Sequence, residues 1–206
     1  MPRVSRQQTD HNRAAIEEAS SRLFREQGIK GVSVADLMGA AGLTHGGFYG
    51  HFESKDALAA VACRHAFAQS VARWEKRVAG KSSPAEALAG LVDGYLSASN
   101  RNHAGAGCPV AGLATDVARE PADKPIHAAY VSGLKALVDV MLRTQASGDP
   151  AADRSRTLAQ MSTLVGAMVL ARATRGDPIS DEFLDSARAQ LLPADSVPAR
   201  VAKVRG

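Results

Sequence analysis

The sequence is poor in aromatic residues and in cysteine. Phe, Trp and Tyr make up only 4% of the 206 residues, although apolar residues of all kinds reach 45%. Alanine supplies much of this apolar content, which favours closely packed helices over a β-sheet core. The two cysteines, Cys63 and Cys108, are too few for a disulfide framework and lack metal-binding spacing. We therefore expect an all-α protein in a reducing compartment, with no metal and no cofactor.

Long apolar runs are missing as well. The most apolar stretch, residues 161–173, is interrupted by Ser162, Thr163 and Arg172, and it is too short to span a bilayer. The first residues are polar and lack the apolar core of a signal peptide. These features predict a soluble, cytoplasmic protein that does not enter a membrane.

The familiar signatures of enzymes are absent from the sequence. We find no paired carboxylates at catalytic spacing, no nucleophile elbow and no metal-binding set of His, Asp and Glu. The glycines of residues 105–109 are too sparse to form a phosphate-binding loop. We therefore predict that the protein is not an enzyme.

The net charge of +4 does not by itself indicate nucleic-acid binding. Residues 1–60 contain seven Lys or Arg and seven Asp or Glu, so this part of the chain is neutral. The basic residues with a favourable local position are Arg3 and Arg6 in the tail and Lys55 at a predicted helix start. A DNA-binding function therefore needs evidence other than overall charge.

Helical periodicity runs through most of the chain, without strand alternation, hairpin signals or an internal repeat. A first helix begins at Thr9 or Asp10 and ends at Gly28, where glycine permits a left-handed turn. A long helix then follows Ser54 to about Val78. Further helices are predicted from Pro84, where Ser83 is the cap and Glu86 completes a capping box, over residues 110–119, 126–141 and 151–175, and from Pro178 to 192.

Residues 33–55 contain two short helices, a tight turn and the start of a third helix. Ser33 is placed to cap the first helix, Gly42 to end it, and Thr44 to cap the second. Interior glycines make the second helix weak, because each costs about 1 kcal/mol relative to alanine. We expect it to be held by Phe48 and Phe52, and to expose the arc that contains His45, Gly46, Tyr49 and Gly50. Two helices joined by such a turn form a helix-turn-helix.

The same stretch resembles the DNA-binding segment of the TetR family of bacterial transcriptional regulators. Residues 41–44 read AGLT and residues 48–58 read FYGHFESKDAL, in the order and spacing of that family. Upstream, Arg13 and residues 23–28, LFREQG, extend the likeness. The resemblance covers about the first third of the chain. It departs from the family at Gly46, Gly47 and Gly50, where many relatives carry larger side chains.

The resemblance implies DNA contacts at particular residues. Ser, Thr, Tyr and Lys donate to phosphates, and a helix N-terminus at Ser54 and Lys55 attracts an anion. His51 is equally well explained as a polar cap. With glycine at the reading positions, base readout would depend on His45 and on close approach of the backbone. Phosphate contacts are expected from Ser33, Thr44, Tyr49, His51 and Lys55, and base contacts from His45, Gly46 and Gly47.

The resemblance also implies two domains with different functions along the chain. We predict an all-α fold with an N-terminal three-helix helix-turn-helix domain followed by a C-terminal bundle of about six helices. A disordered tail is expected over residues 1–8, and the helix-turn-helix domain over 9–54. A ligand-binding and dimerisation domain is expected over 55–192, and a flexible tail over 193–206.

Dimerisation is predicted independently by the apolar pattern of the last two helices. Residues 151–175 appear apolar on almost every side, and residues 178–192 have an apolar face. A four-helix interface between two copies, formed by residues 151–192, would bury both helices. Such a dimer presents two reading helices to a palindromic DNA site.

Large side chains on inward faces of the bundle either fill the core or line a pocket for a small molecule. For each one taken singly, core packing is the more common role. Cys108 has a second interpretation, as a sensor that reacts with an electrophile or oxidant. A helix N-terminus lowers a thiol pKa, and His103 and Arg101 are close in sequence. The candidate ligand-binding residues are Phe67, Trp74, Tyr95, Cys108, Tyr130 and Met141.

We therefore predict a ligand-responsive DNA-binding regulator, most simply a repressor that binds a palindromic double-stranded operator as a homodimer and is released by an unknown small-molecule inducer. A helical protein-interaction module that has lost DNA binding is the alternative. The sequence does not distinguish repression from activation, and it does not identify the inducer, the operator or the regulated genes.

Overall fold

The computed structural model describes residues 6–192 as an assembly of helices without strands. The predicted all-α class is thus confirmed over this range. The predicted tail over residues 193–206 and most of that over 1–8 lie outside the described residues. The first helix begins at Arg6, earlier than the predicted start at Thr9 or Asp10. The elements are α1 Arg6–Gln27, α2 Val34–Ala40, the 3₁₀ helix η1 His45–Gly50, α3 Lys55–Val78, α4 Pro84–Tyr95, α5 Ala98–Asn102, the 3₁₀ helix η2 Ala104–Ala106, α6 Pro109–Arg119, α7 Pro125–Leu142, α8 Pro150–Ala173 and α9 Ile179–Leu191.

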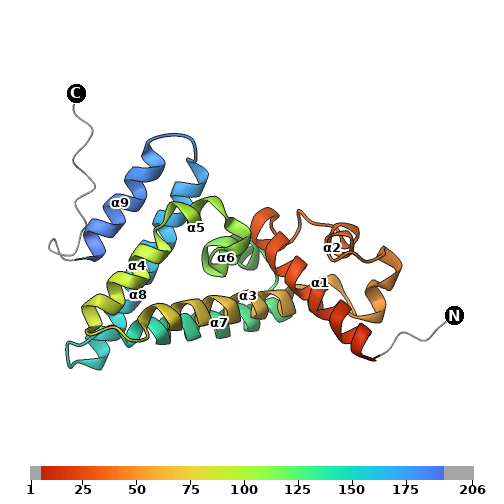
Figure 1. The fold of residues 1–206 in the computed structure, drawn as a ribbon, viewed down its shortest axis with the longest axis horizontal. Helices are drawn as coiled ribbons and strands as arrows, with labels where there is room; N and C mark the ends of the chain where they lie inside the picture. Colours follow the sequence, from red (N-terminus) through yellow and green to blue (C-terminus); the bar gives the residue numbers. More distant parts are fainter. Residues whose placement is uncertain (1–5, 193–206) are drawn as a thin grey trace.

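The molecule is elongated, with α1, α2 and η1 at one end and α8 and α9 at the other (Figure 1). Helices α3 and α7 run side by side between these ends and pack closely. A Cβ on Gly133 of α7 would lie only 2.1 Å from the ring of Phe67 on α3, so glycine is required for this approach. The N-terminal unit is therefore joined to the bundle by a continuous helix rather than by a flexible linker.

Local chemistry sets most helix boundaries. The Ser83 hydroxyl accepts from the Glu86 backbone N–H, and Asp149 caps α8 through the amides of Ala151 and Ala152. The predicted capping box at Ser83 is wrong in one detail, because the Glu86 carboxylate accepts from the amide of Ser82 instead.

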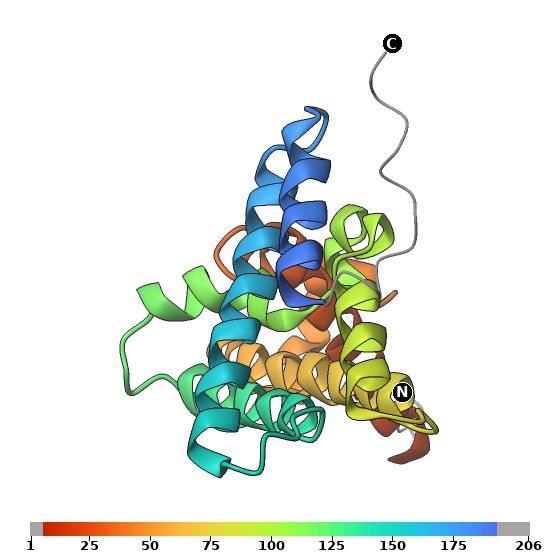
Figure 2. The same cartoon turned by 90° about the vertical axis from the view of Figure 1, so that its left-hand side faces the viewer.

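In the single chain, α8 and α9 are buried on one side only, so the predicted burial of their other sides in a dimer stays a prediction. Helix α9 packs against the C-terminal part of α8 (Figure 2). One face of α8 is buried, with Leu164, Met168 and Ala171 fully enclosed. The opposite face is exposed in the single chain and keeps several large apolar residues at the surface. Leu158, Val169 and Leu170 of α8 and Ile179 of α9 are each 40 to 46% exposed.

Candidate functional site

The turn between α2 and α3 is built by short-range hydrogen bonds. Ser33 accepts from the Asp36 amide, and the Asp36 carboxylate accepts from the Ser33 amide, so the two form a capping box. The Ser33 hydroxyl also donates to that carboxylate at 2.6 Å. These hydrogen bonds, more than the nearby Lys55, lower the pKa of Asp36. Ser33 thus has a structural role that already uses its proton, while its predicted phosphate contact stays a prediction.

Gly42 ends α2 with φ +71°, the left-handed conformation expected from the sequence. Thr44 then occupies the N-cap position of η1 with extended backbone, but its side chain makes no capping hydrogen bond. The prediction that Thr44 caps the second helix is therefore wrong. Its side chain is instead exposed beside the turn, where a hydroxyl is accessible to a partner.

The second helix of the motif, η1, is a 3₁₀ helix rather than an α-helix. Its glycines make an α-helix unfavourable here, and the segment is held in place by Phe48, which is fully buried. The Phe48 ring contacts the rings of Tyr49 and Phe52 at centroid distances of 5.2 and 6.0 Å. The sequence-based inference that phenylalanines support this segment is correct.

The outward face of η1 is almost free of side chains. A Cβ added at Gly46 or Gly50 would meet nothing within 4 Å, and neither residue has a positive φ. A Cβ at Gly47 would make only an ordinary contact, 3.6 Å from Met38. Nothing in the described structure requires glycine at Gly46 or Gly50, in contrast to Gly42. The bare backbone of this face is therefore available for close approach by another molecule.

The remaining predicted DNA contacts surround this bare face. Tyr49 is 73% exposed, although it is a large aromatic residue, and His45 is exposed as well. Lys55 is the first residue of α3, whose N-cap Ser54 accepts from the Ala57 amide. His51 follows η1, and its ring Nδ1 is buried without a hydrogen-bond partner among the described residues.

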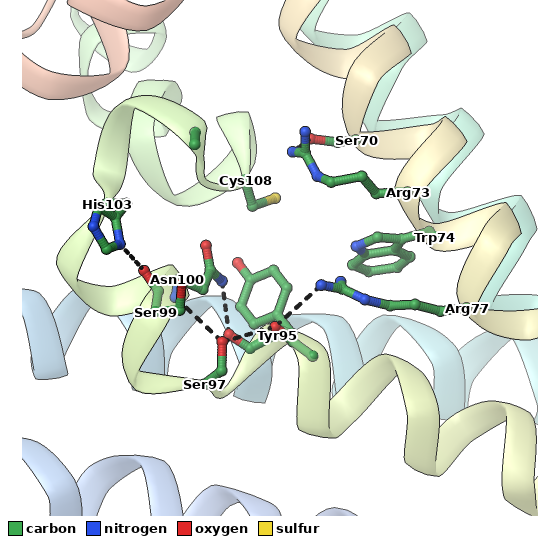
Figure 3. A pocket seen from close by; sticks show the side chains of 12 residues that line it. Ser70, Arg73, Trp74, Arg77, Tyr95, Ser97, Ser99, Asn100, His103 and Cys108 are labelled. Carbon is green, nitrogen blue, oxygen red and sulfur yellow. Dashed lines mark hydrogen bonds between the residues drawn. The ribbon is translucent and has the colours of Figure 1, made fainter.

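A second candidate site is a cavity of about 190 Å³ between α3, α4 and the segment that leads into α6 (Figure 3). Three of the six predicted ligand-binding residues, Trp74, Tyr95 and Cys108, line it together. The rings of Trp74 and Tyr95 meet edge to face at 6.0 Å. The lining is completed by Ser70, Arg73, Arg77, Gly94, Ser97, Ser99, Asn100, His103 and Ala106.

The other three predicted ligand-binding residues lie elsewhere. Phe67 lines a separate apolar groove between α3 and α7, next to Gly133. Tyr130 packs edge to face on Phe67 and donates to the Val110 carbonyl at 3.2 Å. Met141 is fully buried in the core. These three positions do not contribute to the cavity around Tyr95.

The prediction that the Cys108 thiol has a lowered pKa is wrong. Cys108 is the N-cap residue of α6, but it is only 4% exposed, and burial raises its pKa despite hydrogen bonds from the amides of Val110 and Ala111. Arg101 turns away to Asp181 and Ser180, while the His103 ring interacts with the Ser99 carbonyl. The thiol faces the cavity as a neutral group.

Sequence reasoning missed the arginines of the cavity. Arg73 and Arg77 lie one turn apart on α3, on either side of Trp74, and both line the cavity. Their spacing and the intervening tryptophan were the signal in the sequence, since residues four apart share a helix face. The sequence alone does not show that α4 and the segment leading into α6 lie opposite that face of α3.

One buried arginine connects the cavity wall to the N-terminal unit. Arg25 of α1 is only 4% exposed and donates to the Gly107 carbonyl at 2.8 Å. It also donates to the carbonyl and hydroxyl of Ser21 on its own helix. Gly107 precedes Cys108, so this hydrogen bond joins the cavity wall to α1.

The geometry of residues 33–55 is that of a helix-turn-helix, a class of motif that presents its second helix to DNA. Comparison with known proteins agrees. Residues 16–62 match the family model described as bacterial regulatory proteins, tetR family. The segment that holds the helix-turn-helix is therefore of the TetR-family type.

Curated relatives match over less than half of the chain. The chain is 30% identical over 97 residues to the HTH-type transcriptional repressor KstR2 of Mycobacterium tuberculosis strain H37Rv, which is 47% of this chain and 48% of the relative. It is 36% identical over 58 residues to the HTH-type transcriptional regulator AcrR of Shigella flexneri, 28% of this chain and 27% of the relative. The chain thus spans about half or less of the length of these relatives.

Solved structures match over nearly the whole chain. The reduced form of NemR from E. coli superposes with a TM-score of 0.73 at 19% identity, covering 89% of this chain and 98% of that one. FadR from Bacillus subtilis, solved with stearoyl-CoA, gives a TM-score of 0.60 at 15% identity, with coverages of 87% and 97%. At these identities the likeness establishes the fold, and the predicted bundle after the helix-turn-helix is confirmed.

Residues 6–192 contain neither a membrane-spanning helix nor a cluster of metal-binding side chains. No helix in this range is both long and apolar enough to cross a membrane. No group of three or more His, Cys, Asp or Glu side chains in the same range is arranged to hold a metal ion.

Proposed function

We propose that the protein is a homodimeric transcriptional regulator that binds double-stranded DNA through η1 and the residues around it. The observation that carries this proposal is the bare outer face of η1. Gly46 and Gly50 have open space around them and ordinary backbone angles, so their lack of side chains has no internal cause. The absence of side chains is explained if this surface lies directly against the phosphate backbone or a base edge of DNA.

The surrounding side chains suit phosphate contacts. Tyr49 projects a hydroxyl from an exposed ring, and Thr44 keeps an exposed hydroxyl that does not cap η1. Lys55 contributes a positive charge at the N-terminus of α3, where free backbone amides also attract anions. His45 is the base-reading side chain in this proposal.

Dimerisation through α8 and α9 supports the same function. The exposed apolar side chains of α8 and α9 form a surface that a second copy can cover, in a symmetric four-helix arrangement. A dimer presents two copies of η1, which is what an inverted-repeat DNA site requires.

We further propose that a small molecule in the cavity around Tyr95 controls DNA binding. The segment of residues 97–108 lines the cavity and contacts α1 through the hydrogen bond between Arg25 and Gly107. A ligand that favours one position of this segment therefore favours one position of the N-terminal unit. Repression with release by an inducer is the simplest mode, and it agrees with the name of the curated relative KstR2, a repressor.

Selection of bound DNA from a random pool with the full chain tests the proposal. We expect recovery of an inverted repeat, bound by the dimer, with affinity that falls steeply as salt concentration rises. The alternative, a helical interaction module without DNA binding, is favoured by the neutral charge of residues 1–60. It predicts that selection enriches no sequence and that the protein binds no duplex even at low salt.

A further inference from the structure

The cavity around Tyr95 contains positive charge without a matching negative charge. Arg73 donates to the Ser70 hydroxyl at 2.8 Å, and Arg77 makes only a long contact of 3.4 Å with the Gly94 carbonyl. None of the lining residues is Asp or Glu. Within residues 6–192, neither Arg73 nor Arg77 takes part in an ion pair. Both guanidinium groups therefore lack the bidentate anionic partner to which arginine is suited.

Neighbouring arginines increase this imbalance. Burial, followed by repulsion from Arg73, lowers the pKa of Arg25 to about 10, although Glu18 and Glu26 oppose the shift. Burial and then Arg73 also lower the pKa of Arg77. Arg73 is thus half-buried and close to two like charges. An anion bound beside it would offset this repulsion, because partly buried charges are stabilised mainly by an opposite charge.

A buried polar group with no partner points to the same place. The Tyr95 side chain is 1% exposed, and its hydroxyl oxygen has no hydrogen-bond partner in the described structure. The Cys108 side chain is near enough to raise the pKa of the Tyr95 hydroxyl, after the larger effect of burial, but the pair does not meet the geometry of a hydrogen bond. In Figure 3 the Tyr95 oxygen is directed into the space beneath Cys108. A buried hydroxyl of this kind normally has a partner, which a ligand oxygen can supply.

The walls and the volume limit what such a ligand can be. A cavity of about 190 Å³ is somewhat larger than an engineered cavity of about 150 Å³ that accepts benzene. The rings of Trp74 and Tyr95 provide apolar, aromatic surface on one side, and Ser97 and Asn100 provide polar groups on the other. The space therefore suits a molecule of about one ring that carries an anionic group.

We propose that this cavity binds a small organic carboxylate, with Arg73 and Arg77 holding the carboxylate and the Tyr95 hydroxyl donating to one of its oxygens. Trp74 then contacts the apolar part of the ligand. This proposal rests on the proposed function, since it assigns a chemical class to the small molecule that controls DNA binding. The contact between Gly107 and Arg25 carries the effect of the ligand to α1.

The test uses the full chain without DNA and compares each carboxylate with its neutral amide. Benzoate, phenylacetate and butyrate are titrated by calorimetry beside benzamide, phenylacetamide and butyramide, with inorganic phosphate as a further anion. We expect at least one carboxylate to bind about tenfold or more tightly than its amide, because hydrogen bonds to a charged group are the stronger ones. The same carboxylate should raise the melting temperature.

Variants locate the site. Arg73→Met and Arg77→Met should each weaken carboxylate binding about tenfold or more. Arg64→Met is the matched control, because Arg64 lies on the same helix but lines the groove beside Phe67. Tyr95→Phe separates a ligand role from a structural one. It removes a hydroxyl with no internal partner, so it should weaken binding while the melting temperature of the free protein stays the same or rises.

The possible outcomes are distinct. If no carboxylate binds more tightly than its amide, or if both arginine variants bind as tightly as the wild type, the proposal is wrong. Preference for inorganic phosphate over every carboxylate would also contradict it. DNA selection is independent of these titrations. If selection recovers an inverted repeat but no carboxylate binds, the protein is still a DNA-binding regulator and only the ligand proposal is wrong. If a carboxylate binds but selection enriches no DNA, the ligand proposal holds and the proposed DNA-binding function is wrong.

Discussion

The turn around η1 and the bundle cavity differ in where they place positive charge. Gly46 and Gly50 leave part of the exposed surface of η1 without side chains, and residues 1–60 are neutral overall. The cavity contains Arg73 and Arg77, with no carboxylate among its lining residues. A charge argument alone would point to the cavity and away from the helix-turn-helix. In our proposals, DNA binding depends on backbone proximity and a few donors, while ligand binding depends on two half-buried arginines.

The largest expected effect distinguishes a residue of η1 that stabilises the fold from one that contacts DNA. Phe48→Ala removes a fully buried ring and should lower the free energy of unfolding by about 3 to 5 kcal/mol. Tyr49→Ala removes a neighbouring ring that is 73% exposed, so stability should change little while DNA affinity falls. Denaturant unfolding and a DNA-binding titration on both variants test this. Equal loss of stability in the two variants would show that Tyr49 is a structural residue.

At high pH, the buried thiol of Cys63 in the bundle should lower the free energy of unfolding. Burial raises the pKa of Cys63 from 9.0 to about 12. Above pH 9 the unfolded chain loses this proton while the folded chain keeps it, so stability falls as pH rises toward 12. The slope for one thiol is up to about 1.4 kcal/mol per pH unit. Denaturant unfolding of the wild type and Cys63→Ala between pH 8 and about pH 11 measures the contribution.

Slopes rather than absolute stabilities are compared, because Cys63→Ala also leaves a small cavity. The variant should show a shallower decline with pH than the wild type. Identical slopes would mean that the Cys63 thiol is not protected from solvent in the folded state.

A smaller effect tests the phosphate contacts. Lys55→Ala should weaken binding to all DNA sequences similarly and reduce the slope of log affinity against log salt by about one for each protomer, and so by about two for the dimer. Lys76→Ala, at the other end of the same helix, is the matched control and should leave both quantities unchanged. A salt series of binding titrations gives both values. An unchanged slope in Lys55→Ala would place this lysine outside the DNA interface.

The elements predicted well from sequence were those set by local chemistry. Gly28 and Gly42 end helices in left-handed conformations, and Ser33 and Ser83 begin helices through their hydroxyl groups. Each of these interactions joins residues at most four positions apart. They therefore form in the same way whatever the rest of the chain does.

The elements missed were those held by distant partners. Residues 98–106 have no apolar periodicity, yet they form α5 and η2. Arg101 is bonded to Asp181, and the Asn100 carbonyl accepts from Arg172, both across long stretches of sequence. The cavity depends on the same contacts, so its arginines could be noticed in the sequence but could not be assigned to one site.

The glycines of η1 provide the most direct test of the central claim. Gly46→Ala and Gly50→Ala add a methyl group into open space, so the free energy of unfolding should stay the same or rise by up to about 1 kcal/mol. If DNA lies against this face, the same methyl groups should lower DNA affinity by about tenfold or more, a loss near 1.4 kcal/mol. The decisive measurement is the DNA affinity of the two variants on the selected site, at unchanged stability. A fall in affinity supports DNA binding through the bare face of η1, and an unchanged affinity in both variants contradicts it.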